Sequence, residues 1–175
     1  VEEPAKGVLL VDGRWFDDLG RAKFRLYERK LVKNKDDEVD RAVIRTASGE
    51  EKALAHTQRD KNGQLQWSDA EEGAPIKASY KSWMDKVGRL RLMRYARPDE
   101  EEQLKSVQPQ FTVTYQKGGK ELDTIEFRRA PALIEEKAAK GEMAWVRTQY
   151  LGRHARISMN RLDPLAKDLP VILGD

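Results

Sequence analysis

The stretch from Ala74 to Leu90 constrains the fold most, because its apolar residues recur every three or four positions. That spacing places them along one side of an α-helix. Pro75 suits the first turn of this helix, where a missing N–H group leaves no intrahelical bond unmade. An amphipathic helix needs a sheet or another helix to cover its apolar side, so we predict that this helix is central to a mixed fold. The apolar positions are Ile76, Tyr80, Trp83, Met84, Val87 and Leu90.

Segments with alternating apolar residues flank the predicted helix and are typical of strands joined by tight turns. Asn62-Gly63 and Gly118-Gly119 are turn sequences that favour β-hairpins. Leu122 is out of phase with Ile125 and Phe127, which indicates a bulge or a change of face. The predicted strands are Val39–Ala47, Lys52–Arg59, Gln64–Ser68, Gln110–Lys117, Lys120–Arg128, Met143–Tyr150 and His154–Met159, and Leu90–Tyr95 is predicted to be extended.

Three shorter helices are predicted from their end signals. Pro131–Lys140 begins with a proline and precedes Gly141, and Pro98–Ser106 carries acidic residues at its N-terminal end. Leu162–Leu169 is predicted as a terminal helix that Pro170 ends. The predicted fold class is therefore α+β, with antiparallel β-hairpins or a meander packed on the central amphipathic helix and a short C-terminal helix.

The N-terminal segment repeats a pattern found near the C-terminus. A strand is predicted at Gly7–Val11 and a short helix at Trp15–Tyr27. We therefore interpret residues 1–30 as the tail of a preceding repeat and residues 31–175 as one α+β repeat domain. Because the first residue is Val1, we expect the chain to be a piece of a longer protein. The matching positions are Leu9, Val11, Phe16 and Leu19 against Ala155, Ile157, Leu162 and Leu165.

Residue types that carry catalysis are isolated in this sequence. The 175 residues include no Cys, which excludes disulfides and thiolate metal sites in this chain. His56 and His154 lack the spacing of metal ligands, and the acidic clusters Asp36–Glu38, Glu71-Glu72 and Asp99–Glu102 are typical of solvated charge. We expect no catalytic residue, metal or cofactor, and an enzyme assembled from scattered residues is the least favoured hypothesis.

Basic residues gather on the outward side of the predicted helix and just after it. Lys77, Lys81, Lys86 and Arg89 form the candidate partner-contact face. This face is interpreted as a solvated surface balanced by nearby acids, a phosphate-binding surface, or a surface that rests on anionic lipid. The net charge of +3 permits each of these alternatives. The predicted inward direction of Tyr80 and Trp83 disfavours base stacking. Arg91, Arg94 and Arg97 extend the basic stretch beyond the helix.

The order of the predicted elements resembles a known family. Lys30-Leu31-Val32 and the segment Asp37–Ile44 look like its opening, and His154–Ser158 followed by a helix looks like its ending. From Lys30 to Leu173 the chain is similar to a bacterial domain-of-unknown-function family found as repeats in membrane-anchored extracytoplasmic proteins. These proteins are often encoded beside ABC transporters of the gliding-motility auxiliary type. The resemblance rests on apolar patterns and supplies no catalytic residues. The Pro131–Lys140 segment departs from the family pattern.

The resemblance implies a non-catalytic interaction or scaffold domain, with the character of an ABC-transporter auxiliary component. Its expected partner is a protein of an envelope or transport assembly, with an anionic membrane surface as a second contact and no small-molecule ligand. The expected localisation is extracytoplasmic, on the periplasmic side, with an anchor outside this chain. The alternative is a basic nucleic-acid-binding module that uses the Lys77–Arg89 face.

Overall fold

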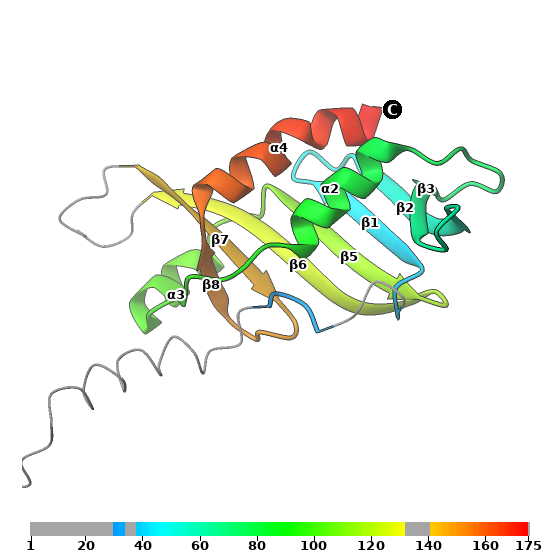
Figure 1. Ribbon diagram of the computed structural model, residues 1–175. Coiled ribbons are helices and arrows are strands. Elements are labelled where there is room, and N and C mark those ends of the chain that lie inside the picture. Colours follow the sequence, from blue (N-terminus) through cyan, green and yellow to red (C-terminus); the bar gives the residue numbers. More distant parts are fainter. Residues whose placement is uncertain (1–29, 34–37, 132–140, 175) are drawn as a thin grey trace, which may run out of the picture.

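A computed structural model describes residues 30–33, 38–131 and 141–174 (Figure 1). Over these residues the fold is α+β, as predicted, with one antiparallel sheet and a C-terminal helix. The helices are α2 (Ala78–Gly88), α3 (Pro98–Lys105) and α4 (Met159–Gly174). The strands are β1 (Arg41–Thr46), β2 (Glu51–Arg59), β3 (Leu65–Asp69), β4 (Arg94–Tyr95), β5 (Phe111–Lys117), β6 (Lys120–Pro131), β7 (Glu142–Thr148) and β8 (His154–Ile157).

The described sheet has the strand order β3-β2-β1-β5-β6-β7-β8-β4, and its neighbouring strands pair antiparallel. Most neighbours are joined by hairpins, as the turn sequences predict. The two outer strands, β3 and β4, are consecutive in the chain, and α2 lies between them. The helix therefore carries the chain over one face of the sheet from one edge to the other (Figure 1).

The β5–β6 hairpin shows how local sequence sets the register. Gly118 and Gly119 have φ values of 56° and 77°, which suit the two-residue turn that their sequence predicts. Tyr115 pairs with Asp123 and the next residue of β5 pairs with Glu121, so Leu122 is the extra residue of a bulge. The predicted irregularity at Leu122 is confirmed. A bulge bends a strand and increases its twist.

The main core lies between one face of the sheet and the helices α2 and α4. The rings of Phe111 and Phe127 stack with centroids 4.4 Å apart, and the ring of Trp83 lies 6.1 Å from Phe111. The indole N–H of Trp83 donates a hydrogen bond of 3.0 Å to the backbone oxygen of Leu165, which links α2 to α4. Large buried rings contribute much of the apolar area in such a core.

Helix α3 contributes to a second, smaller cluster. Leu104 packs there with Trp145, whose neighbours Ala144 and Val146 on β7 belong to the main core. Successive strand residues point to opposite faces, so α3 covers the other side of the sheet. Glu100 at the start of α3 accepts hydrogen bonds of 2.6 and 2.7 Å from the guanidinium of Arg94. These bonds, with one from a backbone N–H, lower the pKa of Glu100 to about 2.

The predicted boundaries of α2 and of α4 are wrong. The central helix begins at Ala78 and not near Pro75, because the N–H of Lys77 bonds to the backbone oxygen of Trp67 and Ile76 forms a bridge with Ser68. The chain before α2 is thus held against the edge of β3. Ile76 is consequently 38% exposed and lies outside the apolar stripe, whose other predicted members are buried.

The C-terminal helix begins at Met159 and not at Leu162, and it continues through Pro170, which was predicted to end it. Leu169 and Ile172 are buried on either side of this proline, and their burial offsets the missing backbone hydrogen bond. Pro131 is the last residue of β6 and does not begin a helix, while residues 132–140 lie outside the described part. The segments predicted within residues 1–29 also lie outside it. Among the described helices, none is long and apolar enough to cross a membrane.

A candidate partner-binding groove beside helix α2

The structure separates the four residues of the predicted contact face. Lys77 lies immediately before α2, where its ammonium is 3.2 Å from the hydroxyl of Tyr80 and 3.5 Å from Asp69. Lys52 approaches the same carboxylate at 2.6 Å, and Tyr80 donates to it at 2.9 Å. Burial acts to raise the pKa of Asp69, but hydrogen bonds from Lys52 and Tyr80 outweigh it and leave the pKa lowered. Lys77 therefore belongs to a network that holds the start of α2 on β3.

Lys86 lies on a different side of the helix and contacts α4. Its ammonium is 2.6 Å from the carboxylate of Asp168, a residue 82 positions further along the chain. Both side chains are more than 40% exposed, so the pair is a surface ion pair between two helices. Lys86 consequently contributes to the packing of α2 against α4.

Lys81 and Arg89 remain together, on either side of Asp85 along one helix stripe. Lys81 lies 3.1 Å from the Asp85 carboxylate and Arg89 lies 3.9 Å from it. The spacing of four residues places all three side chains on the same side of α2. The Arg89 side chain is 79% exposed, so most of its guanidinium faces solvent. These two cations border the groove described next.

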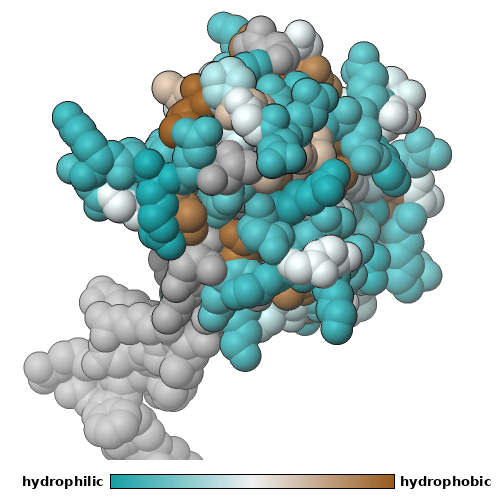
Figure 2. Space-filling view, turned by 90° about the vertical axis from the view of Figure 1, so that its right-hand side faces the viewer, coloured by the Kyte–Doolittle hydropathy of each residue, from teal (hydrophilic) through white to brown (hydrophobic). Residues whose placement is uncertain are grey.

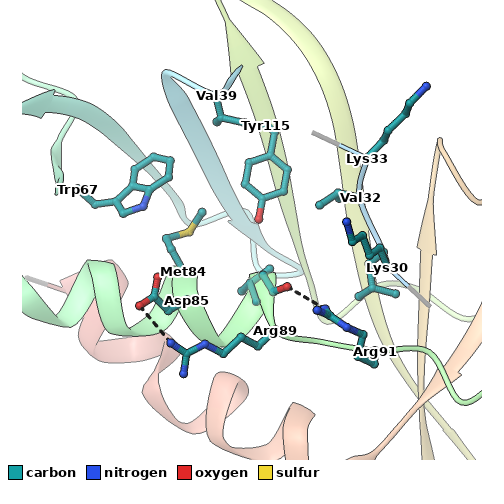
Figure 3. A pocket seen from close by; sticks show the side chains of 13 residues that line it. Lys30, Val32, Lys33, Val39, Trp67, Met84, Asp85, Arg89, Arg91 and Tyr115 are labelled. Carbon is teal, nitrogen blue, oxygen red and sulfur yellow. Dashed lines mark hydrogen bonds and ion pairs between the residues drawn. The ribbon is translucent and has the colours of Figure 1, made fainter. Parts of the chain in front are cut away.

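The groove consists of two hollows that share Trp67 and Asp85 in their walls. The first has a volume of about 470 Å³ and the second about 430 Å³. Figure 3 shows the first hollow, with Trp67 on one side, the Lys30–Lys33 segment on the other, and α2 along its border. The first hollow is lined by Lys30, Leu31, Val32, Lys33, Val39, Trp67, Met84, Asp85, Val87, Gly88, Arg89, Arg91 and Tyr115, and the second by His56, Arg59, Gly63, Gln64, Leu65, Trp67, Lys81 and Asp85.

The floor of the groove is apolar and its rim is cationic. Trp67, Met84 and Tyr115 are each no more than 7% exposed. Arg89 and Arg91 are exposed on the rim, and Arg91 is held against the end of α2 by hydrogen bonds to the backbone oxygens of Gly88 and Leu90. Figure 2 views the side of the molecule on which β3 lies, and hydrophilic residues dominate it with small hydrophobic areas between them.

The Lys30–Lys33 segment is fixed in place from its middle. The hydroxyl of Thr148 donates a hydrogen bond of 3.0 Å to the backbone oxygen of Leu31, whose side chain is 3% exposed. The two flanking lysines are exposed as a result. A buried residue between exposed basic residues is the signal that could have pointed to this rim, yet Lys30, Lys33 and Arg59 were not predicted to be contact residues.

The other groups considered in the sequence lie away from the first hollow. His56 lines the second hollow, where its ring lies 3.6 Å from that of Trp67 and its Nδ1 atom is 2.9 Å from the backbone oxygen of Val39. His154 is buried beneath α3. Arg94 and Arg97 both pair with Glu100 and take no part in the groove. In the described residues, no group of three His, Asp or Glu side chains is placed to hold a metal ion.

Comparisons with protein families, with curated proteins and with solved structures find no match to this chain.

Proposed function

We propose that this chain is a non-catalytic interaction domain that binds a protein partner in the groove beside α2. The observation that carries the proposal is the combination of a buried apolar floor with a rim of exposed cations. Protein-binding sites commonly place a buried apolar core inside a polar rim. In this view α2 is the centre of the architecture: the hairpins pack on its apolar side, and part of its outward side forms the contact site.

The setting is part of the same proposal. The resemblance described above supports a membrane-anchored extracytoplasmic bacterial protein, on the periplasmic side, with a partner in an envelope or transport assembly and an anchor outside this chain. The cationic rim is compatible with an anionic membrane nearby, since surface cations are attracted to anionic lipid. The nucleic-acid alternative is less well supported, because the aromatic side chains of α2, Tyr80 and Trp83, are buried in the core and offer no face for base stacking.

Site-specific photocrosslinking in cells tests the binding site. A photoreactive residue replaces Arg89 on the rim, and a matched one replaces Arg161, which is exposed on α4 outside the groove. We expect a discrete protein adduct at position 89 that is absent at position 161, and mass spectrometry should identify an envelope or transport protein. Equal adducts at both positions, or crosslinks to nucleic acid alone, would contradict the proposal.

Localisation is tested by a separate experiment. Cysteine labelling is suitable, because these 175 residues contain no cysteine. A single cysteine introduced at Lys61, in the exposed turn after β2, can be labelled in intact cells with a membrane-impermeant maleimide. Labelling before lysis is the expected result for the full-length protein on the periplasmic side. Labelling only after lysis would place the domain in the cytoplasm.

A further inference from the structure

We infer that the partner presents an acidic peptide segment with one apolar anchor residue, and that the anchor occupies the hollow between α2 and the Lys30–Lys33 segment. This inference rests on the proposed function and adds the chemistry of the partner. It follows from the shape of the hollow, from the charge of its rim, and from the way its acidic group is already paired.

The buried apolar side chains at the base of the hollow can receive an apolar side chain of a partner. Its volume of about 470 Å³ lies in the range of clefts that bury most of a small ligand, roughly 300–1,000 Å³, so it has room for an anchor side chain. The side chains of Met84, Val87 and Tyr115 line it from α2 and β5, and each is buried. An anchor that enters such a floor loses its contact with water, which is the usual source of affinity at the centre of an interface.

The charge of the rim selects acidic flanks. Among the described residues that line the two hollows, six are cations and one, Asp85, is a carboxylate. That carboxylate lies within ion-pair distance of Lys81 and Arg89. Complementary charge at a rim speeds association and selects between partners. The six cations are Lys30, Lys33, Arg59, Lys81, Arg89 and Arg91.

The cations lie on both sides of the position proposed for the anchor. Lys30, Lys33 and Arg91 lie at the first hollow, while Arg59 and Lys81 lie at the second, beyond the wall that Trp67 forms. A peptide whose anchor enters the first hollow can therefore place acidic residues on both sides of that anchor. An isolated phosphate would use the rim cations but not the apolar floor, so the two features together favour a peptide.

The binding test uses three fluorescein-labelled peptides and the purified chain, with fluorescence anisotropy as the readout. The first peptide carries acidic residues around one Leu, the second has Ala in place of that Leu, and the third has Lys in place of the acids. We expect the first to bind, the second to bind about tenfold more weakly or worse, and the third not to bind. Equal binding of the first two peptides would overturn the anchor, and binding of the basic peptide would overturn the charge argument.

Gly88→Leu is the variant that isolates the hollow. Gly88 lines it from an exposed helical position, and a Cβ atom there would meet no atom within 4 Å apart from its chain neighbours and the backbone of its own helix. The new side chain should obstruct the hollow without strain and should not weaken the fold, because Leu favours helix more than Gly does by about 1 kcal/mol. Ala78→Leu, exposed on the same helix but outside both hollows, is the size control. Undiminished peptide binding by Gly88→Leu would overturn the inference.

The double change Arg89→Glu with Arg91→Glu tests the rim, with Arg161→Glu as its charge control. We expect at least a tenfold loss of peptide binding in the double variant only, and weaker binding of the unchanged protein at high salt. An oligonucleotide or anionic vesicles that bind more tightly than the peptide, with the same loss on charge reversal, would overturn the inference. A protein crosslink at position 89 in cells without peptide binding would leave the proposed function standing and reject only the acidic anchor segment.

Discussion

The Nδ1 atom of His154 lies 2.8 Å from Oε1 of Glu101, and the same carboxylate accepts the backbone N–H of His154 at 2.9 Å. His154 is 1% exposed, and its Nε2 atom has no hydrogen-bond partner in the described residues. Burial lowers the pKa of His154 below its usual value of 6.5, against the opposing effect of Glu101. The neutral imidazole is therefore the form that holds α3 against β8.

This arrangement predicts a loss of stability in mild acid. A histidine whose folded pKa is lowered contributes its full stabilisation above the unfolded value of 6.5, and the contribution is lost as the pH falls below that value. Urea denaturation across this range should show the free energy of unfolding decreasing with pH. His154→Leu should remove that part of the decrease. If the free energy of unfolding depends on pH in the same way in both proteins, His154 is not the cause of the decrease.

The Arg94–Glu100 pair predicts a second acid-sensitive step at lower pH. Glu100 has a folded pKa of about 2 against a usual 4.5, so its contribution is present above pH 4.5 and is lost as the pH falls toward 2. At neutral pH, Glu100→Gln should lower the free energy of unfolding by about 2 kcal/mol, because two charge-assisted hydrogen bonds weaken. The step should be absent from its acid titration, while the step of His154 persists.

The hydrogen bond from Trp83 to Leu165 predicts a measurable cost for a conservative change. Trp83→Phe removes the indole N–H and leaves unfilled volume between α2 and α4. We expect a decrease of about 2 kcal/mol in the free energy of unfolding, measured by chemical denaturation. Tyr150→Phe, at an exposed position on the β7–β8 turn, is the control and should change stability little. An equal effect of both substitutions would argue against the helix–helix link.

The four lysine and arginine residues of the predicted face should separate into two classes. Lys86→Glu places two carboxylates together with Asp168, so it should lower stability by about 0.5–1 kcal/mol and leave peptide binding unchanged. Arg89→Glu, at a side chain 79% exposed, should reduce peptide binding with little effect on stability. Denaturation and anisotropy on the same preparations check both. The reverse pattern would assign the contact to the wrong side of α2.

Pro170→Ala should stabilise the protein. Pro170 is exposed inside α4, and alanine restores the backbone N–H that a proline lacks. The gain should be about 1 kcal/mol, less than the full cost of proline in an ideal helix, since the native helix already accommodates the ring. Thermal unfolding measures it, with Lys167→Ala in the same helix as the control. If stability does not increase, the proline stabilises the protein by restricting the unfolded chain as much as it destabilises the helix.

Hairpins were predictable because their determinants are neighbours in the chain. Gly118-Gly119 sets its own turn, and the phase of Leu122 against Ile125 marks the bulge without any tertiary knowledge. The start of α2 was not predictable in this way. It depends on the hydrogen bond from Lys77 to Trp67, which exists only once β3 has a place at the edge of the sheet.

The groove depends even more on distant parts of the chain. Lys30, Arg59 and Arg89 line one groove although they are distant in the chain, because the sheet orders β3, β2 and β1 side by side and α2 lies over its face. The alignment of Lys81 with Arg89 follows from helix spacing and could be predicted. The ion pair between Lys86 and Asp168 could not be predicted, since the two residues lie 82 positions apart in the chain.

The position of α2 between the two outer strands has a consequence for the order of folding. The β1–β3 meander and the β5–β8 hairpins can each form from neighbouring segments, whereas the pairing of β1 with β5 and that of β4 with β8 both close a long loop of chain. The first of these pairings joins six pairs of residues and the second only two. Closing such a loop costs entropy before any contact compensates it. Because β4 offers so few contacts in compensation, we expect it to pair with β8 after the hairpins have joined through β1 and β5. Pulsed hydrogen exchange should show amides of β5 and β6 protected before those of β4, which makes the outer strand the last part of the sheet to become ordered.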